Sequence, residues 1–240
     1  MGSETAIDLA GAVVLVTGAT GGVGAVAAPA FAEAGASLAL VSRSRERLED
    51  LALSAGIPET LCLLHAADLT DPRQARGAVG ATLARFGRLD VVVNLLGSWA
   101  PGKIASTSDD LWHGQLATNL HAVFYVLREA APRMSDGGAI VNVANALPVE
   151  GRGGQLAYAV AKGAVITLTQ SLALELKPRG IRATVILPRN VDTPGNRALQ
   201  PNADYTSWPS ADDVAQVVLF LSSARAAAVS GALVPVYGGS

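Results

Sequence analysis

The sequence has a single cysteine and few histidines, and these scarcities exclude several classes of protein. Cys62 alone cannot form an internal disulfide or a cysteine-based metal cluster, which fits a reducing compartment. His65, His113 and His121 are widely spaced and match no metal-ligand pattern, so we expect no metal site. With 18 basic against 20 acidic residues, the chain also lacks the basic excess of a nucleic-acid-binding protein.

Charge is missing altogether from residues 9–32, the longest uncharged stretch of the N-terminal half. This stretch exceeds the roughly 18 residues that can cross a membrane, but a glycine cluster and Pro29 interrupt it. Glu4 and Asp8 precede it, where a secretory signal would carry basic residues. We therefore expect a strand, a glycine turn and a helix, in a cytoplasmic protein without a membrane segment.

The 240 residues are 50% hydrophobic and 16% charged, which suits one large folded domain and excludes a disordered chain. Short apolar runs predict strands at residues 12–16, 37–41, 61–65, 90–94, 139–144, 181–187 and 233–236. Longer segments between them predict helices at residues 45–54, 72–86, 109–134, 155–176 and 211–222. This alternation predicts one α/β domain over residues 1–240, a doubly wound parallel sheet of about seven strands with helices on both faces.

Four prolines punctuate residues 188–210 and predict a loop over the carboxyl edge of the sheet. Open α/β sheets bind their ligands at that edge, so we expect this loop to contact the substrate.

A glycine-rich turn, T-G-A-T-G-G-V-G at residues 17–24, follows the first predicted strand. Gly18, Gly22 and Gly24 allow a tight turn and a close approach of the backbone to a pyrophosphate, which the next helix N-terminus attracts. Glycines can also occur in a loop only because the backbone there has no room for a side chain. The position of this turn between a strand and a helix nevertheless favours dinucleotide binding.

The second predicted strand ends in Ser42 and Arg43. An acidic residue here would bind the ribose hydroxyls of NAD, whereas a hydroxyl and a fixed cation favour the 2′-phosphate of NADP. We therefore expect NADP(H), with NAD(H) possible if Arg43 only solvates a helix start.

Tyr158 and Lys162 stand four residues apart in a predicted helix, although the chain has only four tyrosines and three lysines. They share one helix face, and a neighbouring ammonium is expected to lower the pKa of the phenol toward working pH. The pair indicates a proton-transfer site; the alternative is a solvent-facing pair.

Together these features resemble the short-chain dehydrogenase/reductase superfamily, and the resemblance covers essentially the whole chain. Further matching pieces are Asp68-Leu69, Asn119 in T-N-L-H, Y-A-V-A-K at 158–162, Pro188, Asp192-Thr193 and G-A-L-V-P-V-Y-G-G at 231–239. The resemblance implies a Rossmann-type fold around a nicotinamide cofactor. It also implies that Tyr158 exchanges a proton with the substrate oxygen, that Lys162 binds the nicotinamide ribose, and that Asn119 holds a water. The cofactor-binding residues expected from motif and resemblance are Thr17, Gly18, Thr20, Gly22, Val23, Gly24, Ser42, Arg43, Asp68, Leu69, Asn94, Gly97, Lys162, Pro188, Val191 and Thr193.

The chain departs from this family at three places. The serine that typically lies 13 positions before the tyrosine is Asn145, and the residue before it is Ala144. The family's Asn-Asn-Ala-Gly turn reads N-L-L-G at residues 94–97, and its Pro-Gly after the sixth strand reads Pro188-Arg189. An asparagine amide can donate a hydrogen bond to a substrate oxygen, so we count Asn145 among the catalytic candidates.

The leading hypothesis is an NADP(H)-dependent oxidoreductase that acts on a carbonyl/alcohol or imine-like small molecule. Its substrate pocket is predicted to include Trp99, Leu147, Arg189 and Trp208, and Arg189 favours an anionic or strongly polar substrate. The alternative is a dinucleotide-binding protein with impaired catalysis, motivated by Asn145. A fatty-acid type of acyl reductase is a further reading, although the few lysines offer an acidic carrier little to dock on.

The resemblance also implies a homodimer or homotetramer, formed through the helices that hold Asn119 and Tyr158 and through the C-terminal strand. No nucleic-acid or membrane partner is expected.

Overall fold

The computed structural model describes residues 7–151 and 153–238, and its centre is a seven-stranded parallel sheet. The strands are β1 (Val13–Thr17), β2 (Ser37–Ser42), β3 (Cys62–Ala66), β4 (Val91–Asn94), β5 (Ala139–Val143), β6 (Arg182–Pro188) and β7 (Leu233–Val236). Their order is β3-β2-β1-β4-β5-β6-β7, and every neighbouring pair is parallel. The order reverses between β1 and β4, so the carboxyl ends of these strands flank the ligand crevice of a doubly wound fold. The predicted fold class is confirmed.

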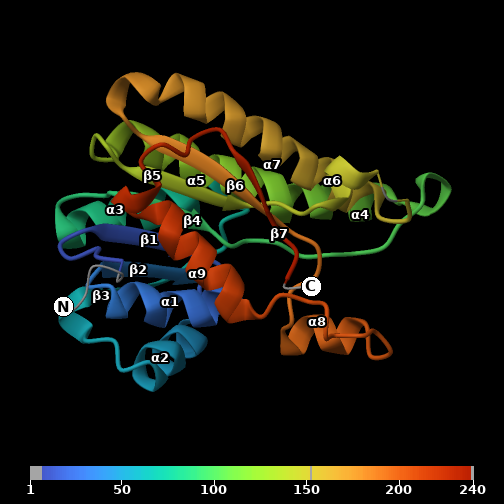
Figure 1. Cartoon of the computed structure of the whole chain (residues 1–240), viewed down its shortest axis with the longest axis horizontal. Helices are drawn as coiled ribbons and strands as arrows, with labels where there is room; N and C mark the ends of the chain where they lie inside the picture. The colour runs from blue at the N-terminus through green and yellow to red at the C-terminus, as the bar shows by residue number, and fades with distance from the viewer. Residues whose placement is uncertain (1–6, 152, 239–240) are drawn as a thin grey trace.

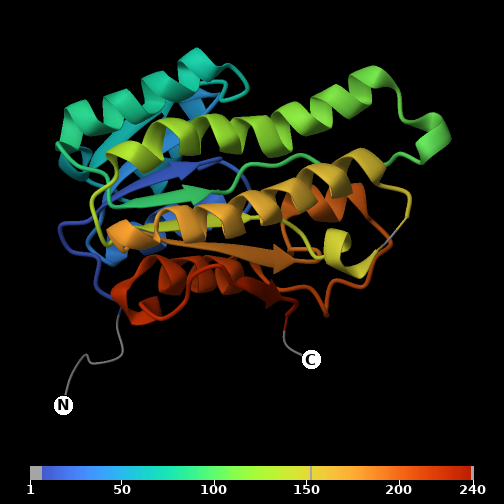
Figure 2. The ribbon, with the colours of Figure 1, turned by 90° about the horizontal axis from the view of Figure 1, so that it is seen from above.

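Helices cover both faces of the sheet, as Figures 1 and 2 show. They are α1 (Gly24–Glu33), α2 (Arg45–Ser54), α3 (Pro72–Phe86), α4 (Asp109–Leu116), α5 (Ala122–Ala130), α6 (Leu147–Glu150), α7 (Leu156–Glu175), α8 (Pro194–Leu199) and α9 (Ala211–Ser222). Side chains of α1, α2 and α9 pack in one core cluster, and side chains of α3, α5 and α7 pack in clusters on the opposite face.

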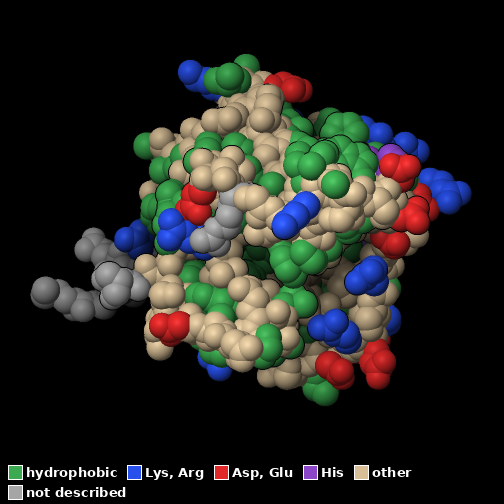
Figure 3. All heavy atoms as spheres, turned by 90° about the vertical axis from the view of Figure 1, so that its right-hand side faces the viewer, with side chains coloured by type: hydrophobic (Ala, Val, Ile, Leu, Met, Phe, Trp, Pro, Cys, Tyr) green, Lys and Arg blue, Asp and Glu red, His purple; other side chains and the backbone are tan. Residues whose placement is uncertain are grey.

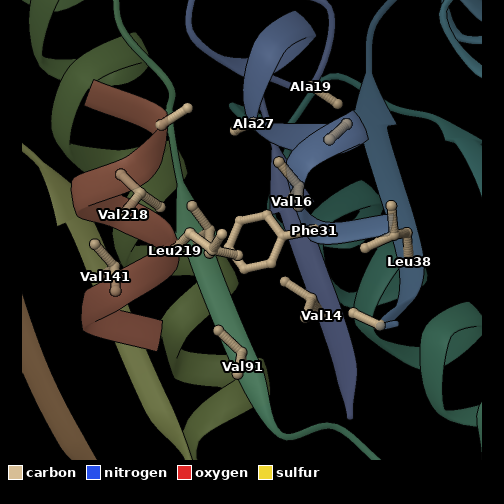
Figure 4. Close-up of a cluster of buried hydrophobic side chains, with 14 of the residues drawn as sticks. Val14, Val16, Ala19, Ala27, Phe31, Leu38, Val91, Val141, Val218 and Leu219 are labelled. Carbon is tan, nitrogen blue, oxygen red and sulfur yellow. The ribbon is translucent and has the colours of Figure 1, made fainter. Parts of the chain in front are cut away.

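The strands read as continuous apolar runs because both faces of the sheet are covered. Along β1, Val14 and Val16 contribute to the cluster around Phe31 of α1, which Figure 4 shows. Leu15, between them, belongs to the cluster on the other face. All four side chains are fully buried, so alternate residues of one strand stabilise two separate helix layers.

The predicted helix over residues 109–134 is interrupted. It consists of α4, a π-turn at Ala117–His121, α5 and a 3-10 turn at Ala131–Arg133. A π-turn inserts one residue into the helical ladder and often marks a functional position. Here it contains Asn119, whose side chain is fully buried.

The predicted loop over residues 188–210 carries a short helix, α8, that the sequence analysis did not anticipate. The segment is closed at its base, where Asp192 forms a bridge with Ser210 and the Asp192 N–H donates to the carbonyl of Pro209 at 2.8 Å. The two ends of the segment that contains α8 are therefore held together by these contacts between Asp192 and residues 209–210.

By length and composition alone, α7 could cross a membrane. In this fold its buried residues include Val165 and Ile166, which pack in one cluster with Val185 and Leu187 of β6. We therefore interpret α7 as a core helix of an α/β domain.

Candidate active site

A cavity of about 400 Å³ lies at the carboxyl ends of β1, β4, β5 and β6, on the side that Figure 3 shows hollowed. Its wall brings together the glycine turn, the segments after β4, β5 and β6, and the first turn of α7. Tyr158, Lys162 and Asn145 all line it. The candidate residues therefore share one space with the edge where open α/β sheets bind ligands.

The glycine turn leaves no room for side chains. Gly18 has a φ of +68°, and a Cβ there would lie 2.9 Å from the carbonyl oxygen of Leu95. At Gly24 a Cβ would lie 2.3 Å from the carbonyl oxygen of Gly18. The Arg47 guanidinium donates to the Thr20 carbonyl at 2.7 Å and holds the turn from outside. This tight backbone fits the close approach that a pyrophosphate requires.

The helix that follows the turn begins without a side-chain cap, at Val23. Its first N–H groups therefore have no side-chain partner and retain the positive end of the helix dipole. Gly22 packs against Thr193, since a Cβ on Gly22 would lie 2.6 Å from Thr193 Cγ2. The glycine turn is thus in direct contact with the start of the α8 segment at Gly22 and Thr193.

Arg43 is the unpaired cation at the end of β2. It is exposed and has no hydrogen-bond or ion-pair partner within residues 7–151 and 153–238. By contrast, the Arg45 guanidinium is 2.6 Å from Glu49, and Arg47 bonds to Thr20. Ser42 Oγ donates to the Ser44 carbonyl at 3.1 Å. Of the three arginines here, Arg43 is the one whose charge is available to an anion.

At the end of β3, Asp68 is exposed and Leu69 is buried. The Asp68 carboxylate accepts from the N–H and the hydroxyl of Thr70, at 3.0 and 2.8 Å. Its backbone N–H donates to Gln74 Oε1 at 2.8 Å. These bonds fix the Asp68-Leu69 turn beside the β2 end, and adenine contact there stays a prediction.

Thr17 and Asn94 are fully buried beneath the cavity. The Thr17 hydroxyl donates to Asn94 Oδ1 at 3.0 Å. Asn94 Nδ2 in turn donates to Asn142 Oδ1 at 2.8 Å. The series ends where Asn142 Nδ2 donates to Thr169 Oγ1, also at 2.8 Å. This chain of bonds joins β1, β4, β5 and α7. Contact of Thr17 or Asn94 with a cofactor would therefore have to come from their backbone atoms.

Lys162 is almost fully buried and is held by backbone oxygens. Its Nζ donates to the carbonyls of Leu96 and Val143, each at 2.9 Å, and burial lowers the pKa of Lys162 to about 8. The carbonyls fix the ammonium at the cavity wall, one turn of α7 beyond Tyr158.

Burial raises the pKa of Tyr158 to about 12. The expected lowering by Lys162 is therefore wrong for the chain without a bound ligand. The physical reason is that desolvation disfavours the phenolate, while the Lys162 ammonium is engaged by the two carbonyls. In this state Tyr158 is a protonated phenol at neutral pH.

Asn119, in the π-turn, is hydrogen-bonded to the backbone of the segment that follows β4. Its Nδ2 donates to the Ser98 carbonyl at 2.9 Å and to the Gln115 carbonyl at 3.0 Å, and its Oδ1 accepts from the Ser98 N–H at 3.2 Å. A Cβ on Gly97 would lie 3.0 Å from Lys162 Nζ and 3.1 Å from Asn119 Oδ1. Gly97 thus lets both predicted site residues approach the same piece of backbone.

The Asn145 carboxamide is bonded to backbone on both sides. Its Nδ2 donates to the Arg189 carbonyl at 2.8 Å, and its Oδ1 accepts from the Leu147 N–H at 2.9 Å. Asn145 is 6% exposed. The residue at the serine position therefore joins two loops of the cavity wall.

Three of the four predicted substrate residues, Trp99, Leu147 and Arg189, line the cavity. Trp208 is not among its lining residues; its ring instead packs edge-on against Tyr205, 5.1 Å between centroids. Membership of the 188–210 loop did not bring it to the cavity because the loop folds on itself. The other cofactor candidates Val23, Pro188, Val191 and Thr193 also line the cavity, as do Gln155, Leu199 and Gln200, which the sequence analysis missed.

Arg189 is paired and is not a free cation. Its Nε lies 2.7 Å from Glu150 Oε1, and its guanidinium lies 4.4 Å from the ring centroid of Tyr237. Because Glu150 balances its charge, Arg189 gives weaker support for an anionic substrate than the sequence suggested.

Comparison with known proteins agrees with the fold. A family model described as enoyl-(acyl carrier protein) reductase matches residues 18–240. The 3-oxoacyl-(acyl-carrier-protein) reductase FabG of Thermotoga maritima is 32% identical over 242 residues, 96% of this chain and 98% of that protein. The D-threitol dehydrogenase of Mycolicibacterium smegmatis is 34% identical over 244 residues, 96% of this chain and 93% of that protein.

Among solved structures, the 3-ketoacyl-(acyl-carrier-protein) reductase of Brucella melitensis, complexed with NADH, is 28% identical with a TM-score of 0.87. The match covers 97% of this chain and 99% of that one. The sheet and its edge cavity define the class of open α/β proteins that bind ligands at the carboxyl edge. Within that class, the chain belongs to the short-chain dehydrogenase/reductase superfamily, and the resemblance inferred from the sequence is confirmed.

Proposed function

We propose that this protein is an NADP(H)-dependent oxidoreductase that interconverts a small carbonyl or imine compound and its reduced form. The observation that carries the proposal is the shared cavity of Tyr158, Lys162 and the glycine turn. When bound, the nicotinamide supplies or accepts the hydride. The glycine turn would hold its pyrophosphate, because Gly18, Gly22 and Gly24 carry no side chains of their own and the helix that follows begins without a side-chain cap.

Tyr158 is proposed to give its hydroxyl proton to the substrate oxygen as the carbon of that C=O gains the hydride. The oxygen becomes a hydroxyl, and the phenolate recovers a proton from water. A pKa of about 12 before ligands bind keeps Tyr158 protonated, which suits the reducing direction. Lys162, fixed by two carbonyls, lies on the same helix face and would stabilise the phenolate that forms.

The preference for NADP(H) rests on Arg43. Its unpaired charge at the end of β2, beside the Ser42 hydroxyl, suits a 2′-phosphate. The Brucella melitensis relative is complexed with NADH, so NAD(H) stays the alternative cofactor. Gly97, Pro188, Val191 and Thr193 line the same cavity and would hold the nicotinamide part of the cofactor.

A carrier-bound 3-oxoacyl thioester is the second candidate substrate, because the Thermotoga maritima relative is a 3-oxoacyl-(acyl-carrier-protein) reductase. The D-threitol dehydrogenase relative favours a small polyol or ketone instead. The reading of impaired catalysis is not favoured, since Tyr158, Lys162 and Asn119 all lie at or against the cavity.

We further propose a cytoplasmic homodimer or homotetramer. The long helices carry exposed apolar side chains, with Phe124 on α5 41% exposed, and Val160 and Leu174 on α7 43% and 76% exposed. Such side chains suit burial between copies of the chain.

The function is tested with Tyr158→Phe and the wild-type chain. We expect Tyr158→Phe to lower kcat by about 10³-fold while leaving the NADPH dissociation constant within a factor of about two. The assay follows NADPH absorbance with ethyl acetoacetate, 9,10-phenanthrenequinone, 4-nitrobenzaldehyde and an acetoacetyl thioester. Turnover that survives the substitution would exclude Tyr158 as the proton donor.

A further inference from the structure

We propose that Gln155 is a catalytic residue of this site. Its side-chain amide would donate the hydrogen bond to the substrate oxygen that a serine provides in relatives. This inference rests on the proposed function, because it concerns the same reacting oxygen.

Asn145 is the residue that the sequence offers for this task, and the structure shows its amide engaged elsewhere. One end of the carboxamide bonds to the Arg189 carbonyl, and the other accepts from the Leu147 N–H. Releasing either bond would leave a backbone group without its partner near the cavity floor, which costs about 1–3 kcal/mol. Donation to a substrate is therefore unfavourable for Asn145.

Gln155 stands three residues before Tyr158, where α7 begins, and both side chains line the cavity. Gln155 is the N-cap residue of α7, with a non-helical φ of −148°, and it shares the cavity wall with Tyr158. The backbone on both sides of Gln155 is fixed: the Gly102 N–H donates to the Gly154 carbonyl at 2.9 Å, and the Leu156 N–H donates to the Gly102 carbonyl at 3.0 Å. Gln155 is thus held rigidly beside the proton donor.

Trp99 sets the orientation of the Gln155 carboxamide. Its indole Nε1 donates to Gln155 Oε1. An indole nitrogen can only donate, so the atom that faces Trp99 must be the oxygen and the NH₂ must face away. That NH₂ has no hydrogen-bond acceptor in the described part of the chain. Its two N–H groups are therefore available to a ligand.

Other amides on the cavity wall are engaged. Asn196 Nδ2 donates to the Val191 carbonyl at 2.8 Å, and Gln200 Nε2 donates to Asn190 Oδ1 at 3.4 Å. Asn190, on the segment after β6, is the one competitor among the described lining residues. Within the described cavity wall, only Gln155 combines an NH₂ that has no acceptor with a place at the start of the helix of Tyr158.

The decisive variants are Gln155→Ala and Gln155→Glu. Glutamate keeps the oxygen that accepts from Trp99 but, when ionised, offers no N–H or O–H donor. At pH 8 we expect both variants to lower kcat by about 10²–10³-fold with the NADPH dissociation constant unchanged. As the pH falls from 8 to 5, the Gln155→Glu activity should rise relative to Gln155→Ala, since a protonated carboxyl regains a donor. Titration of other groups, such as Lys162 with its pKa of about 8, is shared by both variants, so the ratio of the two activities isolates residue 155.

Trp99 is a positioning residue in this scheme. Trp99→Phe should lower kcat by about tenfold, and the double variant Trp99→Phe/Gln155→Ala should be no slower than Gln155→Ala alone, since the two residues act through one bond. Gln170→Ala and Gln170→Glu make the same chemical changes on an exposed position of α7 and should leave kcat as in the wild type.

The proposal is overturned if Gln155→Ala keeps more than a third of the wild-type kcat, if the Glu-to-Ala ratio is flat with pH, or if Asn190→Ala produces the loss instead. In each of these cases the proposed oxidoreductase function stands. A wild-type chain that binds NADPH and reduces none of the four probe compounds overturns both proposals together.

Discussion

The side-chain nitrogen of Asn145 lies 2.8 Å from the carbonyl oxygen of Arg189. This bond joins the segment after β5 to the segment after β6, and the bond from the Leu147 N–H to Asn145 Oδ1 fixes the start of α6. A serine hydroxyl is too short to reach both partners, so the asparagine at this position joins two segments of the cavity wall in a way that a serine could not.

Asn145→Ala should therefore destabilise the fold. It leaves the Leu147 N–H and the Arg189 carbonyl without their partners, at a cost of about 2 kcal/mol in the free energy of unfolding. For a chain of this size, that loss corresponds to a Tm lower by about 4–8 °C, measured by calorimetry. Asn202→Ala, an exposed substitution, is the control and should leave the Tm within about 2 °C.

Asn145→Ser separates the structural role from a catalytic one. We expect a lower Tm and no gain in kcat, because the serine loses both bonds of Asn145 while the proposed donor, Gln155, is unchanged. A severalfold rise in kcat with an unchanged Tm would contradict this account and return the catalytic assignment to Asn145.

Arg43→Ala should weaken NADPH binding selectively. Loss of one charge-assisted bond to a phosphate removes about 1.5–3 kcal/mol, so the NADPH dissociation constant should rise by about 10- to 150-fold while that for NADH changes little. Fluorescence titration of both cofactors measures this. Arg45→Ala removes a neighbouring arginine that is paired with Glu49 and should leave both constants nearly unchanged. Equal weakening of NADPH and NADH by Arg43→Ala would exclude a 2′-phosphate contact.

The sheet could be predicted because strands that are buried on both faces have nearly continuous apolar sequences, as at Val13–Thr17. The glycine turn also indicates where the first strand passes into its crossover helix. The positions of Tyr158 and Lys162 followed from helical spacing, which is a local property. Contacts between segments that are far apart in the sequence leave no comparable periodic pattern. The Trp99–Gln155 bond joins residues 56 apart, and neither residue belongs to a periodic pattern that would indicate it.

The π-turn was missed for a related reason. Residues 117–121 have the same helical composition as the segments on either side, and the inserted residue is stabilised by bonds from Asn119 to the distant Ser98 backbone. The pKa of Tyr158 depends on how completely the fold buries it, and spacing to Lys162 alone predicted the opposite direction. Sequence therefore indicated the candidate residues but not the contacts that set their burial and orientation.

Gly97→Ala should disable the site with little effect on the fold. The new Cβ would lie 3.0 Å from Lys162 Nζ, which two carbonyls hold in place, so the ammonium or the backbone must move. Displacement of about 1 Å at a catalytic group lowers kcat by about 10²-fold. Gly80→Ala on α3, where nothing lies within 4 Å, is the matched control and should be neutral or stabilising by about 0.5–1 kcal/mol. Equal kcat in the two variants would mean that the Gly97 contact is unimportant.

Lys162 should make the stability of the cofactor-free chain depend on pH. Its pKa is about 8 when folded, against an ordinary value of 10.5, so between these pH values the unfolded chain binds a proton that the folded chain has released. Raising the pH through this window disfavours unfolding, and the free energy of unfolding should rise by up to about 1.4 kcal/mol per pH unit. Tyr158, with its pKa raised from 10.0 to about 12, acts in the opposite direction above pH 10.

Urea unfolding of the wild type and of Lys162→Met between pH 7 and 10 isolates the lysine. Cys62, whose pKa burial raises to about 11, and Tyr158 contribute equally to both chains, so the difference between the two curves reports residue 162 alone. Below pH 8 the buried Lys162 is charged, and its desolvation lowers the free energy of unfolding of the wild type. This destabilisation should decrease as the pH rises toward 10. The stability of the wild type relative to Lys162→Met should therefore be greater at pH 10 than at pH 7. Parallel curves would mean that the ammonium has an ordinary pKa in the folded chain, and that the carbonyls of Leu96 and Val143 compensate fully for its burial.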